Sequence, residues 1–158
     1  MPPYSRRSCT FAKIPPNSDR AVDDAFPGAH LVVPSPGQTA GFGLVLPDYP
    51  KRMFGAGELS DGTLRYLAVA GALLGYRLPA FIALNEPETS LHPELLEPLA
   101  RMVVRAAQRT QIWVVTHSSE LAGAIADETG AVPREVVRTD DGTSIKGLTG
   151  LGNFEDDD

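Results

Sequence analysis

Two short apolar runs dominate the hydrophobic pattern of this chain, FIAL at residues 81–84 and QIWVV at residues 111–115. Runs of this length are typical of strands that are buried on both faces of a parallel sheet. Helical patterns precede, separate and follow the two runs. The order helix, strand, helix, strand, helix predicts an α/β fold, a parallel sheet with crossover helices on its faces.

Three helices are predicted around these strands. Apolar residues recur at helical spacing after Ser60, which is placed to cap the first turn. The clearest amphipathic stretch begins near Pro93, and its apolar side chains stand at positions 95, 96, 99, 102, 103 and 106. A third helix follows the sequence THSS and ends before Gly130.

Antiparallel strands are predicted on both sides of this α/β region. Residues 30–33 and 42–46 are strand-like and are separated by a turn-rich segment, which indicates an antiparallel flap. After the last helix, two further strand-like segments flank Asp140-Asp141-Gly142 and indicate a β-hairpin.

Composition divides the chain into three parts. Residues 1–16 are rich in proline and lack periodicity, so we expect a disordered lead-in. Residues 17–150 form the predicted lobe, and residues 151–158 form an acidic, disordered tail. With 158 residues, of which 42% are hydrophobic, the chain is long enough for one domain with a core.

Charge and cysteine content exclude several classes of protein. The net charge of -6 argues against a strong, non-specific electrostatic interaction with nucleic acid. The single cysteine, Cys9, excludes an internal disulfide and a multi-cysteine metal site. The sequence has neither a signal-peptide core nor an apolar span of about twenty residues, so we expect a cytoplasmic protein without a membrane partner.

Polar side chains follow both apolar runs. Asn85, Glu86 and Glu88 come after the first predicted strand, and Thr116 and His117 come after the second. Ligands of open parallel sheets bind beyond the carboxyl ends of the strands. The sequence therefore predicts a functional site at this edge of the sheet.

Three sequences resemble motifs of ABC-type ATPases. ELSDGTLRYL resembles the signature loop, FIALNEPETSLHP the Walker B strand with the D-loop after it, and IWVVTHSSEL the switch-histidine strand. The similarity is greatest to AAA-type ATPases related to RecF and SMC heads, in which a His-Pro pair follows the Walker B turn. It covers roughly residues 42–150 and implies a partial P-loop NTPase fold, ATP and Mg²⁺ as cofactors, and ATP hydrolysis.

The resemblance implies roles for the residues at the strand ends. Glu86 corresponds to the catalytic glutamate, which orients or deprotonates the attacking water, and His117 to the histidine that contacts the γ-phosphate. Asn85 replaces the usual aspartate that helps to hold Mg²⁺, and Glu88 can compensate for this neutral amide.

The resemblance also implies a phosphate contact in trans. Ser60, Asp61 and Gly62 lie in the signature loop, where free N–H groups and the helix dipole favour a phosphate bound to the opposite subunit of a dimer. His92 lies in the D-loop, through which the subunits of the family communicate.

Each of these residues also has a purely structural interpretation. Ser60 can simply cap a helix, Glu86 and Glu88 can be turn carboxylates, and His117 can be a structural residue after a strand. The His92-Pro93 pair can simply mark the start of a helix, because proline is common in the first helical turn. Three arginines on one helical face can contact nucleic acid, but a solvated polar face is the favoured interpretation; they are Arg101, Arg105 and Arg109.

A phosphate loop of the type G-x-x-x-x-G-K-[ST] is missing, because none of Lys13, Lys51 and Lys146 lies in such a context. We therefore expect the C-terminal portion of a longer ATPase, acting as a homodimer or with a separate half that bears the Walker A loop. Part of the apolar sheet would then lack its cover, and the isolated chain would be marginally stable.

Two functions follow from these observations. The first is ATP binding and hydrolysis as part of an ABC/SMC-like head. The second is a non-catalytic interaction module that supplies its signature loop to a partner and is inactive alone.

Overall fold

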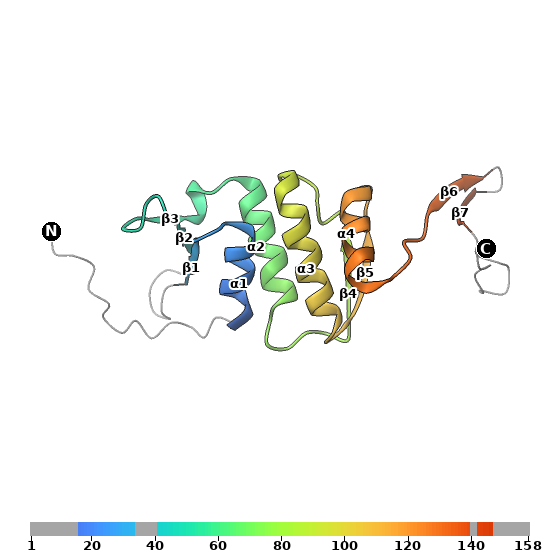
Figure 1. Cartoon of the computed structure of the whole chain (residues 1–158), viewed down its shortest axis with the longest axis horizontal. Helices are drawn as coiled ribbons and strands as arrows, with labels where there is room; N and C mark the ends of the chain where they lie inside the picture. Colours follow the sequence, from blue (N-terminus) through green and yellow to red (C-terminus); the bar gives the residue numbers. More distant parts are fainter. Residues whose placement is uncertain (1–15, 34–40, 140–141, 147–158) are drawn as a thin grey trace.

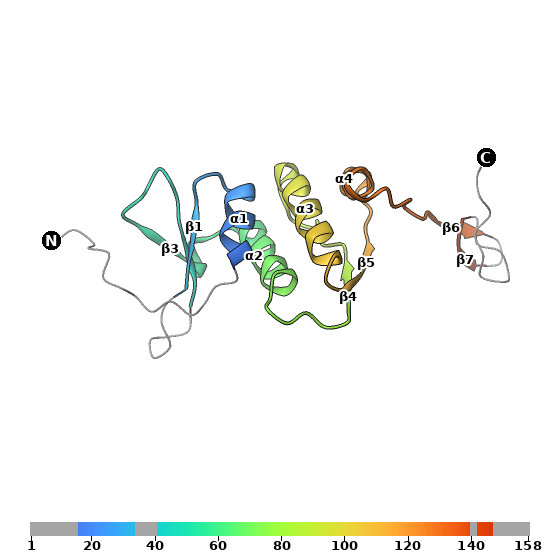
Figure 2. The same ribbon diagram turned by 60° about the horizontal axis from the view of Figure 1, so that its bottom comes forward.

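The computed structural model describes residues 16–33, 41–139 and 142–146, and Figures 1 and 2 show the arrangement of the elements. In chain order these are α1 (Pro16–Ala25), β1 (His30–Val32), β2 (Gly43–Val45), β3 (Met53–Gly55), the 3-10 turn Ala56–Glu58, α2 (Asp61–Leu73), β4 (Phe81–Asn85), the 3-10 turn Pro93–Leu95, α3 (Leu96–Ala107), β5 (Gln111–Val115), α4 (Ser119–Thr129), β6 (Val136–Thr139) and β7 (Gly142–Ile145). The predicted α/β class is confirmed. The expected lead-in and tail lie outside the described residues, apart from Pro16, which begins α1.

Local hydrogen bonds define where the helices begin and end. The hydroxyl of Ser60 caps α2 by accepting a hydrogen bond from the Thr63 N–H at 3.2 Å. The Ser118 hydroxyl caps α4 in the same way. Gly130 ends α4 with a φ of 68°, a left-handed conformation that glycine adopts without a steric penalty.

The core is built on α3. Its predicted apolar stripe is confirmed, because every member is buried, namely Leu95, Leu96, Leu99, Met102, Val103 and Ala106. The helix contacts α1, α2 and α4, and it also covers the inner side of the β4–β5 sheet. Pro98 lies in the first turn of α3, where backbone N–H groups have no helical acceptor, so the helix continues to Ala107.

Strands β4 and β5 are parallel, as predicted, and Asn85 is paired with Val115 at their carboxyl ends. The expectation of complete burial is wrong. Alternate side chains point to the core, while Phe81, Trp113 and Val115 on the other side are 47%, 58% and 43% exposed. Helices of the described chain cover only one side of the sheet. The apolar sequence is therefore typical of strands that are buried on both faces, whereas the described helices of this chain pack against one face only.

The flap and the hairpin lie at opposite ends of the molecule (Figures 1 and 2). The predicted flap contains a third strand, because β3 pairs with β2 in an antiparallel sheet. Its buried Leu44 packs with Val22 and Leu67, which joins the flap to α1 and α2. The predicted hairpin is confirmed as the antiparallel pair β6–β7, which lies apart from the helices.

The two sides of the β4–β5 sheet should respond differently to truncation. Leu99→Ala removes a fully buried side chain, and we expect it to lower the free energy of unfolding by about 2–5 kcal/mol. Trp113→Ala removes a larger but mostly exposed side chain, so we expect a loss of about 1 kcal/mol or less. Urea denaturation followed by circular dichroism measures both. A larger loss for Trp113→Ala would show that the open face is covered in the folded chain.

Candidate functional site

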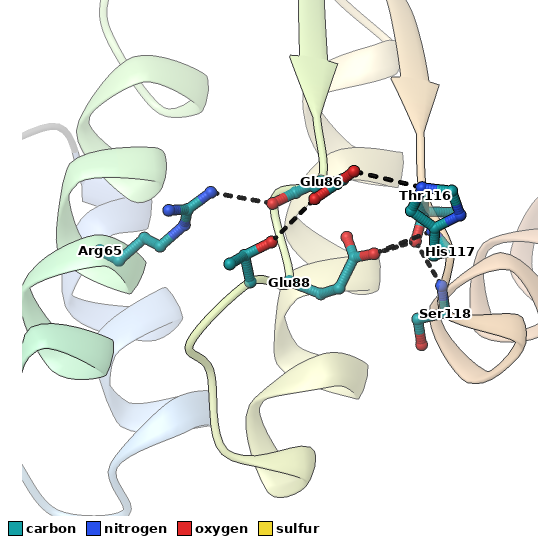
Figure 3. A network of polar contacts seen from close by, with 7 residues as sticks. Arg65, Glu86, Glu88, Thr116, His117 and Ser118 are labelled. Atoms are coloured by element: carbon teal, nitrogen blue, oxygen red, sulfur yellow. Dashed lines mark hydrogen bonds and ion pairs between the residues drawn. The ribbon is translucent and has the colours of Figure 1, made fainter.

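The carboxyl ends of β4 and β5 bring two turns together (Figure 3). The Glu86 N–H donates to the Val115 carbonyl at 2.8 Å and so extends the strand pairing by one residue. The turn after β4 therefore lies beside Thr116 and His117, which follow β5. This arrangement is the one that the sequence predicts for the two sets of polar residues.

The side chain of Glu86 lies at the accessible edge of this site. Its Oε1 atom is 3.2 Å from His117 Nε2, and its Oε2 atom accepts a hydrogen bond from the Thr89 hydroxyl at 3.4 Å. The two side chains of the Glu86–His117 pair are 41% and 85% exposed. A carboxylate in this position can accept a proton from a bound water, and the imidazole beside it can donate to an anion.

The backbone of Glu86 is held by α2. Arg65 Nη2 donates to the Glu86 carbonyl at 2.9 Å (Figure 3). Sequence reasoning missed this residue, because a contact between positions 21 residues apart leaves no local signal. The nearest clue is a lone arginine between apolar residues in the sequence TLRYL.

The side chain of Glu88 points to the turn after β5 and joins the two turns (Figure 3). Its Oε1 atom accepts hydrogen bonds from the Thr116 hydroxyl and from the His117 N–H, the latter at 3.1 Å. The Thr116 hydroxyl oxygen in turn accepts from the Ser118 N–H at 2.9 Å. Glu88 therefore fixes the turn that carries His117, which is a more definite role than that of a solvated turn residue.

The ionised form of Glu88 is favoured by these hydrogen bonds. Burial raises the pKa of its carboxyl, but hydrogen bonds from Thr116 and from nearby backbone N–H groups outweigh burial and bring the pKa below its ordinary value. The Oε2 atom is buried and has no hydrogen-bond partner among the described residues. The site thus contains a carboxylate oxygen with unused capacity as an acceptor or ligand.

Asn85 is the last residue of β4 and is exposed on the open side of the sheet. The described part of the chain has no cluster of three or more His, Cys, Asp or Glu side chains that could hold a metal ion. Mg²⁺ is often held by one or two carboxylates together with substrate phosphates and waters. The Oε2 atom of Glu88, which has no partner among the described residues, is an oxygen of the kind that Mg²⁺ binds, and Asn85 stays a predicted ligand.

The remaining candidate residues form a second group. Ser60, Asp61, Gly62 and His92 line a surface hollow between the start of α2 and the segment Ser90–Leu95. Three of them have structural roles there. The Ser60 hydroxyl caps α2, His92 Nδ1 accepts from the Glu94 N–H, and Gly62 lets the Ser90 carbonyl approach closely. Within one chain, the signature residues and the strand-end residues therefore form separate groups.

The arginine face of α3 is occupied by contacts within the chain. Arg101 pairs with Glu97 at 3.4 Å, and Arg105 lies 3.8 Å from Asp24. Arg109 Nη2 donates to the carbonyls of residues 75 and 76, both at 3.0 Å. These contacts favour the structural interpretation of the three arginines over nucleic-acid binding.

Comparison with known proteins shows what this chain is similar to. Residues 50–123 match the family described as "AAA domain, putative AbiEii toxin, Type IV TA system". The chain is 40% identical over 75 residues to ABC transporter A family member 12 of Arabidopsis thaliana, and 39% identical over 75 residues to member 10. Each alignment covers 48% of this chain, and the chain spans only 8% of the length of either relative.

Solved structures show the same fold. The SMC head domain from Thermotoga maritima superposes with a TM-score of 0.63 and 18% identity, over 85% of this chain and 47% of that chain. A chain from work on "ATP-driven dimerization and DNA stimulated activation of SMC ATPases" superposes with a TM-score of 0.64 and 13% identity, over 90% of this chain and 88% of that chain. The fold is therefore that of a P-loop NTPase-like lobe. Together, the sequence similarities and the shared fold make the chain similar to a portion of an ABC/SMC-like ATPase.

Within the described residues, none of the helices has the length and apolar character needed to cross a membrane.

Two glycines of α2 provide a test of the close contact at Ser90. A Cβ atom on Gly62 would lie 2.6 Å from the Ser90 carbonyl oxygen, whereas a Cβ atom on Gly71 would have no neighbour within 4 Å. We expect Gly62→Ala to lower the free energy of unfolding by about 1–3 kcal/mol because of this clash. Gly71→Ala should raise it by about 0.5–1 kcal/mol, since alanine favours the helix. Urea denaturation measures both, and changes of the same sign would contradict the contact.

The role of Glu88 predicts a pH-dependent loss of stability. We expect Glu88→Gln to lower the free energy of unfolding by about 1–3 kcal/mol at pH 7, because a charged acceptor is lost. The pKa of Glu88 is depressed in the folded state, so its contribution is present above the ordinary glutamate pKa and disappears as the pH falls through the depressed value. The difference between wild type and variant should therefore shrink as the pH is lowered from 7 to below the ordinary glutamate pKa.

Denaturation with urea at a series of pH values measures this difference. Glu97→Gln is the matched control, because the Glu97 side chain is 76% exposed and its surface ion pair contributes little. A Glu88→Gln difference that stayed constant with pH would exclude the carboxylate as its cause.

Proposed function

We propose that this chain contributes to ATP hydrolysis as the C-terminal lobe of an ABC/SMC-like ATPase head, with residues 17–150 as the lobe. One observation carries the proposal. The accessible carboxylate of Glu86 lies 3.2 Å from the imidazole of His117, where two parallel strands end. Ligands of open parallel sheets bind at this edge, and phosphoryl transfer to water needs a group that orients the water.

Each residue of the strand-end group has a role in this mechanism. Glu86 orients the attacking water and accepts its proton, while His117 donates a hydrogen bond to the γ-phosphate. The oxygens of Asn85 and Glu88 would help to hold a Mg²⁺, and the bound ion would supply positive charge next to the phosphates. Glu88 also keeps His117 in place through the bond to its N–H.

The signature residues act on a second nucleotide. Ser60, Asp61 and Gly62 lie at the start of α2 and line an open hollow together with His92. The N–H groups at this helix start can receive a phosphate of the opposite subunit in a dimer. Separation of this group from the strand-end group supports a contact in trans.

A complementary half supplies the phosphate loop. The chain has no lysine in a Walker A context, and its sheet has an uncovered apolar face with Phe81, Trp113 and Val115. In the fold comparison, the chain accounts for 47% of the Thermotoga maritima SMC head. A second polypeptide segment that covers this face would complete both the sheet and the nucleotide site.

The second candidate function is a non-catalytic module that offers its signature loop to a partner. The neutral, exposed Asn85 in the metal-binding position and the missing phosphate loop favour it. The two candidate functions differ in whether the strand-end site of this chain hydrolyses ATP.

Phosphate release from Mg-ATP tests the catalytic role of Glu86. We expect Glu86→Gln to lower kcat by at least about 100-fold, because an amide cannot accept the proton of water. The matched control is Glu97→Gln, an exposed glutamate on α3 that should leave kcat unchanged. A malachite green assay at saturating ATP measures the released phosphate.

The same assay separates the two candidates. Wild-type turnover that Glu86→Gln does not reduce would overturn the catalytic role. No turnover and no ATP binding by the isolated chain would favour the non-catalytic module, and ATP binding with micromolar affinity would exclude it.

A further inference from the structure

Helix α2 contacts the loop after β4 at two backbone carbonyls. Arg65 Nη2 donates to the Glu86 carbonyl at 2.9 Å. One turn earlier, the Cα atom of Gly62 packs against the Ser90 carbonyl so closely that a Cβ atom would lie 2.6 Å from its oxygen. The loop that carries Glu86, Glu88 and His92 is thus held along the first two turns of α2.

These contacts coincide with local backbone strain. Among the described residues, Glu86 and Ser90 are the non-glycine residues with positive φ, at 45° and 67°. Such conformations are costly for residues other than glycine and persist only when the surrounding structure holds them. α2 contacts the carbonyls of these same two residues, so it contributes to holding the conformation of the loop.

Arg65 acts on the backbone of Glu86 and leaves its carboxylate free. In the described part of the chain, the ion-pair partner of the Glu86 carboxylate is His117. Figure 3 shows the guanidinium on the α2 side of the turn and the carboxylate directed to the opposite side. The direction of the Glu86 side chain therefore depends on a carbonyl that is fixed by α2.

We propose that Arg65 is a positioning residue that couples the signature end of α2 to the catalytic carboxylate of Glu86. The inference rests on the proposed function, because it assigns a positioning role at that same site. Ser60, Asp61 and Gly62 lie at the start of the helix that carries Arg65. Through the hydrogen bond of Arg65, the position of this helix sets the position of the Glu86 carbonyl.

Hydrogen–deuterium exchange of the full chain tests the mechanical step without any need for turnover. The Thr89 N–H donates to the same Glu86 carbonyl at 3.1 Å, so its exchange reports on this turn. We expect Arg65→Met to speed exchange in residues 86–92 by about tenfold, because the variant loses one charge-assisted hydrogen bond. Exchange in α3 and α4 should stay unchanged.

Two variants serve as controls in this experiment. Arg65→Lys keeps a charged donor, so exchange in residues 86–92 should be slower than in Arg65→Met and close to wild type. This conservative variant also provides a test if Arg65→Met folds poorly. Arg77→Met removes an exposed arginine from the connection after α2 and should have no effect. Exchange in residues 86–92 that is equal in wild type, Arg65→Lys and Arg65→Met would overturn the coupling.

Steady-state phosphate release then tests the link to catalysis. We expect Arg65→Met to lower kcat about tenfold while KM stays within about twofold, because the residue contacts Glu86 and not the nucleotide. Arg65→Lys should recover most of kcat. A change in KM alone would overturn the positioning role.

The two proposals fail in different ways. A wild-type chain that neither binds ATP nor releases phosphate favours the non-catalytic module over the proposed function, and the exchange experiment still decides whether Arg65 holds the turn. If turnover is lost in Glu86→Gln but unchanged in Arg65→Met, the result supports the proposed function and overturns the positioning role of Arg65.

Discussion

Burial of the apolar stripe of α3 is the interaction on which the other elements depend. The helix follows β4 and precedes β5 in the chain, and its buried side chains contact α1, α2, α4 and the inner side of the sheet. Because both strands pack against α3, their carboxyl ends stay aligned, with Asn85 beside Val115. The polar turns beyond those ends lie side by side because the strand ends are aligned. Hydrophobic packing in the centre of the lobe thus determines the geometry of a polar site at its edge.

The turn after β4 gives its two carboxylates different environments. Glu86 faces solvent next to an imidazole, whereas Glu88 accepts hydrogen bonds from the neighbouring turn and has one oxygen buried. The donors that hydrogen-bond to Glu88 Oε1 stabilise the charged form of this carboxylate, which makes it a weaker base. The carboxylate of Glu86 has an open side and can interact with water. The two carboxylates of one turn therefore suit different roles, although they lie only two positions apart.

Local patterns predicted the helices and strands of the α/β region, but they missed β3. The 3.6-residue period identified α3, the hydroxyl residues Ser60 and Ser118 marked helix starts, and the two apolar runs gave a parallel pair. The candidate residues of the strand ends were predicted to lie together, because parallel strands end at one edge. The missing phosphate loop predicted that part of the sheet lacks its cover, and Phe81, Trp113 and Val115 are exposed on such a face. The letters of FIAL alone do not give this result, because they are the same whichever polypeptide segment covers the strand. The contact of Arg65 and the direction of the Glu88 side chain depend on residues distant in the chain, which no local pattern encodes.

The open face of the sheet also gives the chain an optical property. Trp113 is the single tryptophan of the sequence, and it stands on this face with 58% of its surface exposed. Indole emission depends on the polarity of its surroundings, so the fluorescence of the unlabelled chain arises from the one surface that a complementary lobe would cover. Assembly of the head can thus be followed in solution without a dye, at the residue where the two lobes would meet.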